Sequence, residues 1–137
     1  MTGKTASERL TREVRVVAEP QFLPHYSAPE DNHYVYSYRI RIRNESSRTL
    51  MVAARHWLII DTDGNRDEVD GLGVVGEQPV LEPGEEFEYS SFCPLACPFG
   101  TMEGWYEVVD EQGERFHVEI GRFFLVARPD LELEHVG

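Results

Sequence analysis

Hydrophobic and polar residues alternate strictly along the segment His33–Asn44. Aromatic and aliphatic side chains fall on one face of this segment: Tyr34, Tyr36, Tyr38, Ile40 and Ile42. Three arginines, Arg39, Arg41 and Arg43, fall on the other face. Because successive side chains of a strand point to opposite faces of its sheet, this pattern predicts an antiparallel strand with one face buried.

Several other segments have the same character. Leu50–Asp61 is apolar on both faces, as expected of a strand at the centre of a sheet. Turn residues separate the segments, with Asp-Gly inside Asp61–Glu68, Pro83-Gly84, and a hairpin at Asp110–Glu114. Further strands are predicted over Val14–Leu23, over a short segment after Asp61–Glu68, and over Phe87–Cys93, Met102–Asp110 and Arg115–Ala127. About seven strands without a helical period predict an all-β fold, an antiparallel sandwich of immunoglobulin or fibronectin type III type.

The length of 137 residues suits one domain with a sizeable core. The predicted sandwich covers residues 13–127. Residues 1–12 are polar and are predicted to form a disordered tail, and residues 128–137 are predicted to form an acidic C-terminal tail.

The chain is strongly acidic, with 25 aspartates and glutamates against 13 basic residues and a formal net charge of −12. Such a surface repels nucleic-acid phosphates and anionic membranes, so neither is expected as a partner. No apolar run approaches the roughly 20 residues of a membrane span, and the N-terminal segment lacks the apolar region of a secretory signal. We therefore expect a cytoplasmic protein in which Cys93 and Cys97 are thiols, their redox role being open.

The segment Gly71–Gly76, GLGVVG, has the spacing G-x-G-x-x-G of dinucleotide-binding loops. Such a loop binds a pyrophosphate because a helix begins inside it, and here Pro79 and Pro83 exclude a helix of useful length. Two interpretations follow. Gly71, Gly73 and Gly76 either allow turns and bulges at a sheet edge, or form a backbone nest that binds an anion without a helix.

Neither a closed metal site nor a catalytic constellation is predicted. DTDGN lacks the glycine and glutamate positions of a calcium loop, although Asp61, Asp63, Asp67 and Glu68 could gather a divalent cation weakly. Cys93 and Cys97 have no second ligand pair in the sequence. We expect no cofactor, and we expect the arginine face of His33–Asn44 to pair with glutamates on neighbouring strands.

Ordered motifs along the chain resemble those of the ApaG family: Tyr34–Asn44 (YVYSYRIRIRN), Arg55–Ile60 (RHWLII), Asp63–Gly64, Glu68–Val80 (EVDGLGVVGEQPV), Leu81–Tyr89 (LEPGEEFEY), Pro98–Met102 (PFGTM) and Gly104–Asp110 (GWYEVVD). The resemblance covers about residues 12–127. It implies a fibronectin type III-like β-sandwich with a non-enzymatic role. Bacterial members are associated with cobalt and magnesium resistance or efflux, and in eukaryotes the domain resembles a protein-interaction module. Gly71, Gly73 and Gly76 match the glycine motif of the family, for which nucleotide binding has been suggested.

Two functional hypotheses follow. The first is a non-enzymatic binding module that recognises a protein partner through its sheet faces or through the loop Gly71–Gly76. The second is a small-ligand binder that takes a polyphosphate, a nucleotide or a divalent cation at the same loop. The sequence leaves the identity of the partner and the oligomeric state open.

Overall fold

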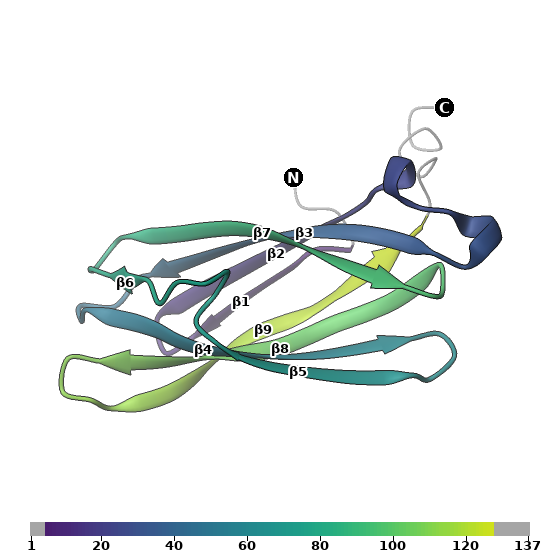
Figure 1. The fold of residues 1–137 in the computed structure, drawn as a ribbon. Helices are drawn as coiled ribbons and strands as arrows, with labels where there is room; N and C mark the ends of the chain where they lie inside the picture. Colours follow the sequence, from purple (N-terminus) through teal and green to yellow (C-terminus); the bar gives the residue numbers. More distant parts are fainter. Residues whose placement is uncertain (1–4, 128–137) are drawn as a thin grey trace.

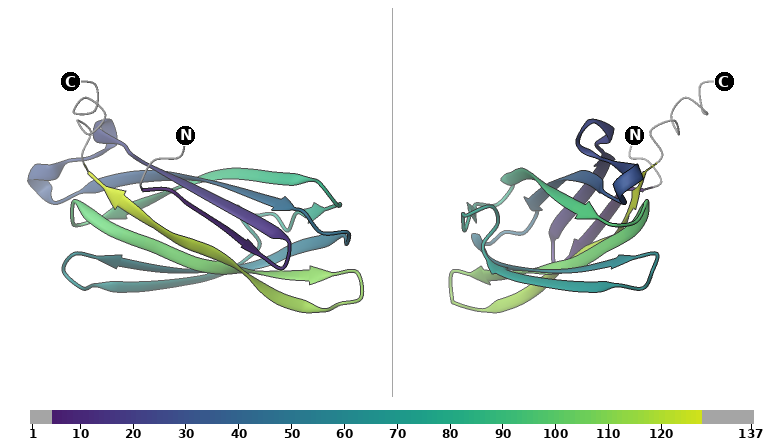
Figure 2. Two further views of the ribbon diagram at one scale, coloured as in Figure 1. Left: turned by 180° about the vertical axis from the view of Figure 1, so that it is seen from behind. Right: turned by 45° about the vertical axis from the view of Figure 1, so that its right-hand side comes forward.

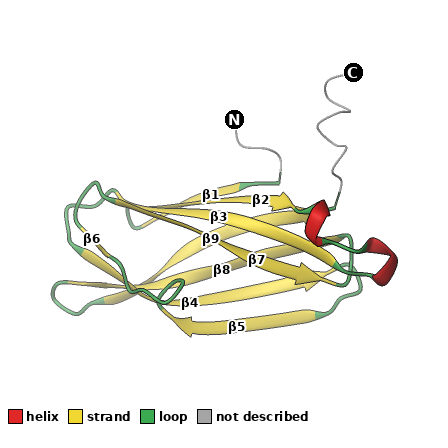
Figure 3. Cartoon of the chain, turned by 45° about the horizontal axis from the view of Figure 1, so that its top comes forward, coloured by secondary structure: helices red, strands yellow, loops and turns green. Residues whose placement is uncertain are grey.

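The computed structural model describes residues 5–127, which form a sandwich of two antiparallel sheets (Figure 1). Sheet I has the strand order β1 (Ser7–Thr11), β2 (Val14–Phe22), β3 (Tyr34–Asn44) and β7 (Glu86–Leu95). Sheet II has the order β5 (Arg66–Leu72), β4 (Leu50–Asp61), β8 (Phe99–Asp110) and β9 (Arg115–Val126), and the short β6 (Val80–Leu81) also pairs with β4. Two 3₁₀ turns, Pro24–Tyr26 and Pro29–Asp31, lie together at one end of the sandwich (Figure 3).

The core lies between the two sheets and follows the alternation in the sequence. On β3, Tyr36, Ile40 and Ile42 are fully buried, and they face residues of sheet II such as Tyr106 and Phe123. All seven strands predicted from the sequence are present, and the predicted antiparallel β-sandwich is confirmed. The architecture is consistent with the fibronectin type III-like fold.

The N-terminal boundary of the domain was predicted wrongly, because Ser7–Thr11, placed in a disordered tail of residues 1–12, form β1. This strand pairs with β2 along its whole length, and its Ser7 hydroxyl donates a hydrogen bond to the carbonyl of Gly121 at 2.7 Å. Its side chains are largely exposed, so no apolar alternation marks it. The turn into β2 has positive φ at Arg12 and Glu13. Glycine or asparagine usually occupies such positions and marks a hairpin turn in the sequence, and neither residue is present here. The predicted tail 128–137 lies outside the described residues.

The two sides of the sandwich differ. On one side β1 packs against β9, and the two strands lie next to each other in Figure 2. On the other side β7 ends sheet I and β5 ends sheet II, and each has a neighbouring strand on one edge only. The described residues therefore leave one side of the sandwich open. Within residues 5–127, no helix has the length and apolar character needed to cross a membrane.

Candidate functional site

The glycine loop ends in a tight two-residue turn. Val74 and Glu77 exchange backbone hydrogen bonds of 2.7 and 2.9 Å, and the two residues between them have φ values of 43° for Val75 and 81° for Gly76. Positive φ at both central positions is the hairpin turn of type I′, which favours glycine at the second position. Gly76 therefore serves the turn, whereas Val75 is a β-branched residue in a region that L-residues rarely adopt.

The other two glycines, Gly71 and Gly73, leave room for neighbouring atoms that a side chain would displace. A β-carbon at Gly73, whose φ is 61°, would overlap the carbonyl oxygen of Glu77. A β-carbon at Gly71 would lie 2.6 Å from the Cζ atom of Arg55. The guanidinium of Arg55 occupies this space and donates two hydrogen bonds of 3.0 Å, to the carbonyls of Leu72 and Gly73. Arg55 thus fixes the loop against β4.

Internal hydrogen bonds also occupy N–H groups that an anion would need. The amide of Gly73 donates to the carbonyl of Ala53 at 2.7 Å, and the amides of Val74 and Glu77 donate to each other's carbonyls. Of the two interpretations of Gly71, Gly73 and Gly76, the turn-forming one matches this geometry. Binding of a polyphosphate or a nucleotide at the loop stays a prediction.

A groove of about 500 Å³ opens between the edge strands β5 and β7, on the open side of the sandwich. Its apolar lining includes Tyr38, Trp57, Val69, Phe92, Leu95 and Met102. Trp57 and Met102 are buried at its base, while Val69 and Phe92 are exposed at its rim. We call this feature the β5–β7 groove.

The register of β4 and β5 orders the charged residues of the groove. Arg55 lies opposite Gly71, Trp57 opposite Val69, and Ile59 opposite Asp67. Arg55 and Asp67 therefore lie at opposite ends, separated by four residue steps or about 13 Å of strand. An apolar centre with a cation at one end and a carboxylate at the other can orient a bound chain.

Sequence reasoning did not identify the groove. A signal was present, since Val69, Leu72 and Val75 are apolar residues within an acidic, glycine-rich stretch. All three are exposed in the structure, Leu72 to 79%. Periodicity does not reveal that Phe92, 23 positions after Val69 in the sequence, lines the same groove.

The hairpin tip and Cys97 meet at the end of β4. Donor atoms of Asp61, Asp63 and Cys97 lie within 4.8 Å of one another, and the Cys97 thiol donates to the Asp63 carboxylate at 3.2 Å. The side chain of Asn65 donates a hydrogen bond to Asp61, which lowers the pKa of this aspartate, and Asp61 also accepts backbone N–H groups of its own turn. Its carboxylate thereby closes the hairpin.

The other two residues of the predicted cation-gathering set lie elsewhere, Asp67 in the β5–β7 groove and Glu68 beside His56 at 3.2 Å. Cys93 and Cys97 are both free and buried, as expected for thiols. Burial raises the pKa of Cys93 to about 11, so its thiol is protonated at neutral pH.

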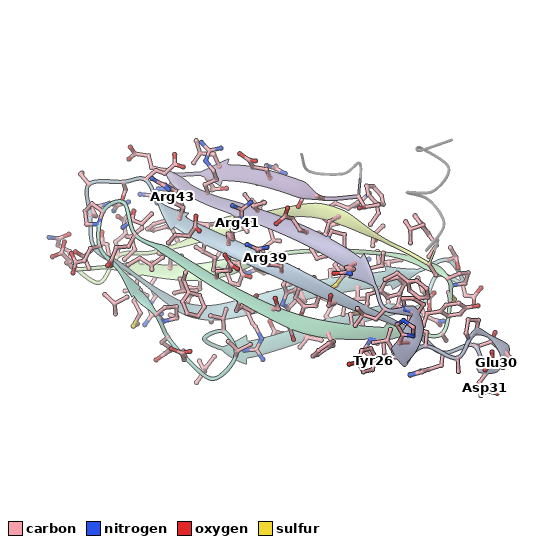
Figure 4. All side chains as sticks on the ribbon, turned by 90° about the horizontal axis from the view of Figure 1, so that it is seen from above. Tyr26, Glu30, Asp31, Arg39, Arg41 and Arg43 are labelled. Carbon is pink, nitrogen blue, oxygen red and sulfur yellow. The ribbon has the colours of Figure 1, made fainter. Side chains whose placement is uncertain are left out.

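The arginine face of β3 forms ion pairs on the outer surface of sheet I, where Arg39, Arg41 and Arg43 follow one another along the strand (Figure 4). Arg39 contacts Glu88 on β7 at 2.8 Å, and Arg41 contacts Glu19 on β2 at 3.7 Å. Arg43 lies 3.9 Å from Glu45, just beyond its own strand. The predicted pairing with glutamates on neighbouring strands is confirmed for Arg39 and Arg41, whereas Arg43 contacts a glutamate that follows its own strand.

Two histidines that are distant in the sequence meet on the outer surface of sheet II. The rings of His56 and His117 stack on Trp105, with centroid distances of 4.1 and 5.0 Å. The ring nitrogens of His56 face the carboxylates of Asp70 and Glu68. The two imidazole rings cover faces of the Trp105 ring. Both ring nitrogens of His56 already have a carboxylate partner, so this cluster offers His56 no free polar atom for a ligand.

Comparison with known proteins agrees with this architecture. The ApaG domain matches residues 24–110. A protein named ApaG from Paramagnetospirillum magneticum is 50% identical over 115 residues, which covers 84% of this chain and 88% of the relative. One from Rhizobium etli is 50% identical over 116 residues, covering 85% and 89%.

Solved structures agree as well. A crystal structure of an ApaA protein from Bordetella pertussis superposes with a TM-score of 0.82 at 46% identity, covering 85% of this chain and 94% of that protein. The C-terminal domain of wzt shares the fold alone, with a TM-score of 0.57 at 9% identity. On the strength of the matching domain and these relatives, the chain belongs to the ApaG family.

Proposed function

We propose that the protein is a non-enzymatic, cytoplasmic binding module that recognises a protein partner through the β5–β7 groove and the adjacent glycine loop. The distribution of exposed apolar side chains carries this proposal. Among residues 5–127, eight large hydrophobic residues are exposed, and four of them lie at the groove or the loop: Val69, Leu72, Val75 and Phe92. A local concentration of exposed apolar surface is typical of interaction sites.

The backbone of Val75 supports the same proposal. A non-glycine residue in the left-handed region costs about 1–3 kcal/mol, and such residues concentrate at functional sites. Val75 has φ 43° and an exposed side chain, so it gains little burial in return. The hydrogen bonds of Arg55 hold the preceding residues Leu72 and Gly73 in place. A rigid loop that presents exposed apolar side chains suits binding better than it suits stability.

Cys93 lines the groove, and its thiol supports a non-enzymatic role. Catalytic cysteines have a lowered pKa because an adjacent cation or a helix N-terminus stabilises the thiolate. At Cys93 burial raises the pKa to about 11. The cation of the groove, Arg55, is hydrogen-bonded to loop carbonyls. We assign the cobalt and magnesium resistance associated with the family to the protein partner rather than to metal chemistry in the groove.

Site-specific photo-crosslinking tests this function. A photoreactive phenylalanine analogue replaces Phe92 at the rim of the groove, and the matched control carries it at Tyr26, at the end of the sandwich that bears the 3₁₀ turns. The two positions are similarly exposed, at 66% and 70%.

In a lysate of the source organism, we expect a discrete protein adduct from position 92 only. Excess unlabelled wild-type protein should suppress it, and the Val69→Asp variant should not. Equal adducts at both positions, or adducts that no competitor suppresses, would refute the proposal.

A further inference from the structure

The β5–β7 groove also indicates what kind of chain it binds, an inference that rests on the proposed function. We propose that an extended basic segment of the partner adds to sheet II as a strand beside β5. Its side chains would follow the order apolar-x-basic, with the apolar residue in the groove and the basic residue beside Asp67.

The backbone of β5 carries the first step. Strand β5 pairs with β4 along one edge, and on its other edge the described residues place no strand. An unpaired edge presents a row of N–H and C=O groups, which natural proteins usually cover or protect. An extended peptide can pair with such an edge and place alternate side chains into pockets. The opposite side of the sandwich offers no comparable edge, because β1 packs against β9.

The register places the side chains of such a guest strand. Asp67 and Val69 line the groove opposite Ile59 and Trp57, and Gly71 lies opposite Arg55. Residues two apart in a strand share a face. A guest side chain opposite Val69 therefore lies at the mouth of the groove, with Val69 between it and Trp57, and the guest side chain two positions away lies beside Asp67. If the guest runs antiparallel to β5, the commoner arrangement, the residue beside Asp67 follows the apolar residue by two positions.

The negative charge of Asp67 favours a basic residue at the guest position beside it. The neighbouring acidic residues have partners: Glu68 lies 3.2 Å from His56 and 3.9 Å from Arg66, and Asp70 contacts His56. Among the described residues Asp67 has no ion-pair partner within 4 Å. Its carboxylate lies four residue steps from Arg55, the cation of the groove. A lysine or arginine of the guest would therefore complete an ion pair that the fold leaves open.

A second copy of this chain fits the edge less well. Antiparallel pairing of two β5 strands about Val69 would bring Glu68 of each copy opposite Asp70 of the other. Like charges directly opposite each other destabilise a sheet. The net charge of −12 on each copy adds repulsion over a longer range. A basic segment of another protein is the occupant that the charges favour.

Defined peptides test the proposal. The probe is the acetylated ten-residue peptide GTVTWTKTVG, in which tryptophan is the apolar residue and lysine follows it by two positions. One matched peptide carries glutamate in place of the lysine, and another carries proline in place of the threonine between tryptophan and lysine. Each peptide is titrated into isotope-labelled protein at low salt, and amide NMR shifts are recorded. The Asp67→Lys variant is titrated with the same peptides, and Glu30→Lys serves as a control with an equal charge change at an exposed site that does not line the groove.

For the wild type we expect saturable shifts at amides of β5 and β7, with the lysine peptide binding about tenfold more tightly than the glutamate peptide. Proline should abolish binding because it removes a backbone donor. Asp67→Lys should reverse the charge preference, and Glu30→Lys should leave it unchanged.

Equal binding of both charged peptides, shifts elsewhere, or shifts at β5 that appear on concentrating the protein alone would overturn the proposal. If this proposal fails while the adduct at position 92 persists, the binding function stands and the nature of the partner segment is wrong. Loss of the specific adduct would refute the function itself.

Discussion

The guanidinium of Arg55 occupies the space that a side chain at Gly71 would need, so an arginine on β4 and a glycine on β5 fit together as one unit. The same guanidinium bonds the carbonyls of Leu72 and Gly73. The conformation of the glycine loop therefore depends on a side chain outside the loop.

The glycines should differ in their tolerance of substitution. Gly71→Ala displaces only the end of the flexible Arg55 side chain, and we expect it to cost about 1–2 kcal/mol through lost hydrogen bonds. Gly73→Ala places a methyl group against the carbonyl of Glu77 at positive φ, so its cost should be larger. Urea unfolding measures both, with Gly113→Ala, which has positive φ and open space, as the control. Equal costs at positions 71 and 73 would contradict the assigned roles.

The backbone conformation of Val75 should lower the free energy of unfolding, while its exposed side chain contributes to binding. Val75→Asn provides the residue that the first central position of a type I′ turn prefers, so the free energy of unfolding should rise by about 1 kcal/mol. The same change removes an exposed apolar side chain, and the adduct at position 92 should weaken. Val80→Asn, at an exposed valine in β6, is the control for loss of apolar surface alone. A destabilised Val75→Asn variant would show that the turn is not strained at this position.

The buried tyrosines make a matched pair of tests. The hydroxyls of Tyr89 and Tyr106 lie 2.5 Å apart in the core, and burial raises the pKa of both groups. Tyr106→Phe leaves the Tyr89 hydroxyl buried without this partner and should cost about 1–2 kcal/mol. Tyr36 is equally buried, but its hydroxyl has no hydrogen-bond partner within residues 5–127, so Tyr36→Phe should be neutral or stabilising. Thermal unfolding of the two variants distinguishes these outcomes.

Asp110 should make stability depend on acid pH. Burial acts to raise its pKa, but hydrogen bonds from the amides of Glu114 and Gln112 and from Arg48 outweigh burial, and the pKa is lowered. A carboxylate with a lower pKa in the folded state stabilises the fold above its unfolded pKa of about 3.9. This stabilisation is lost as the pH falls through the folded value.

Asp110→Asn should therefore be less stable than the wild type at pH 7, and the difference should shrink near pH 2. Circular dichroism at both pH values measures the melting temperatures, with the exposed Glu30→Gln as the control. A difference of the same size at both pH values would show that charge is not the cause.

The sequence predicted most strands of the fold, but it did not predict the residues that form the groove. Alternation along Tyr34–Asn44 and the apolar run Leu50–Asp61 reflect burial between two sheets, which sequence periodicity records directly. Strand β1 escaped prediction because backbone pairing and contacts with distant β9 hold it in place, and neither depends on its own apolar residues. The roles of Gly71 and Gly73 depend on Arg55 and Glu77, which only the folded chain brings against them. The groove likewise combines Val69 with Phe92 across two sheets.

The packing of β1 against β9 has a consequence for how this domain can be carried by other chains. The amide of Phe124, close to the end of the described chain, donates to the carbonyl of Thr5 at its start, at 2.9 Å. The two ends of the described segment, residues 5–127, therefore lie close to each other, on the side of the sandwich opposite the β5–β7 groove. A domain with adjacent ends can be inserted into a surface loop of a host protein, or circularly permuted through a short linker, without stretching either partner. Such an insertion would leave the groove free to bind.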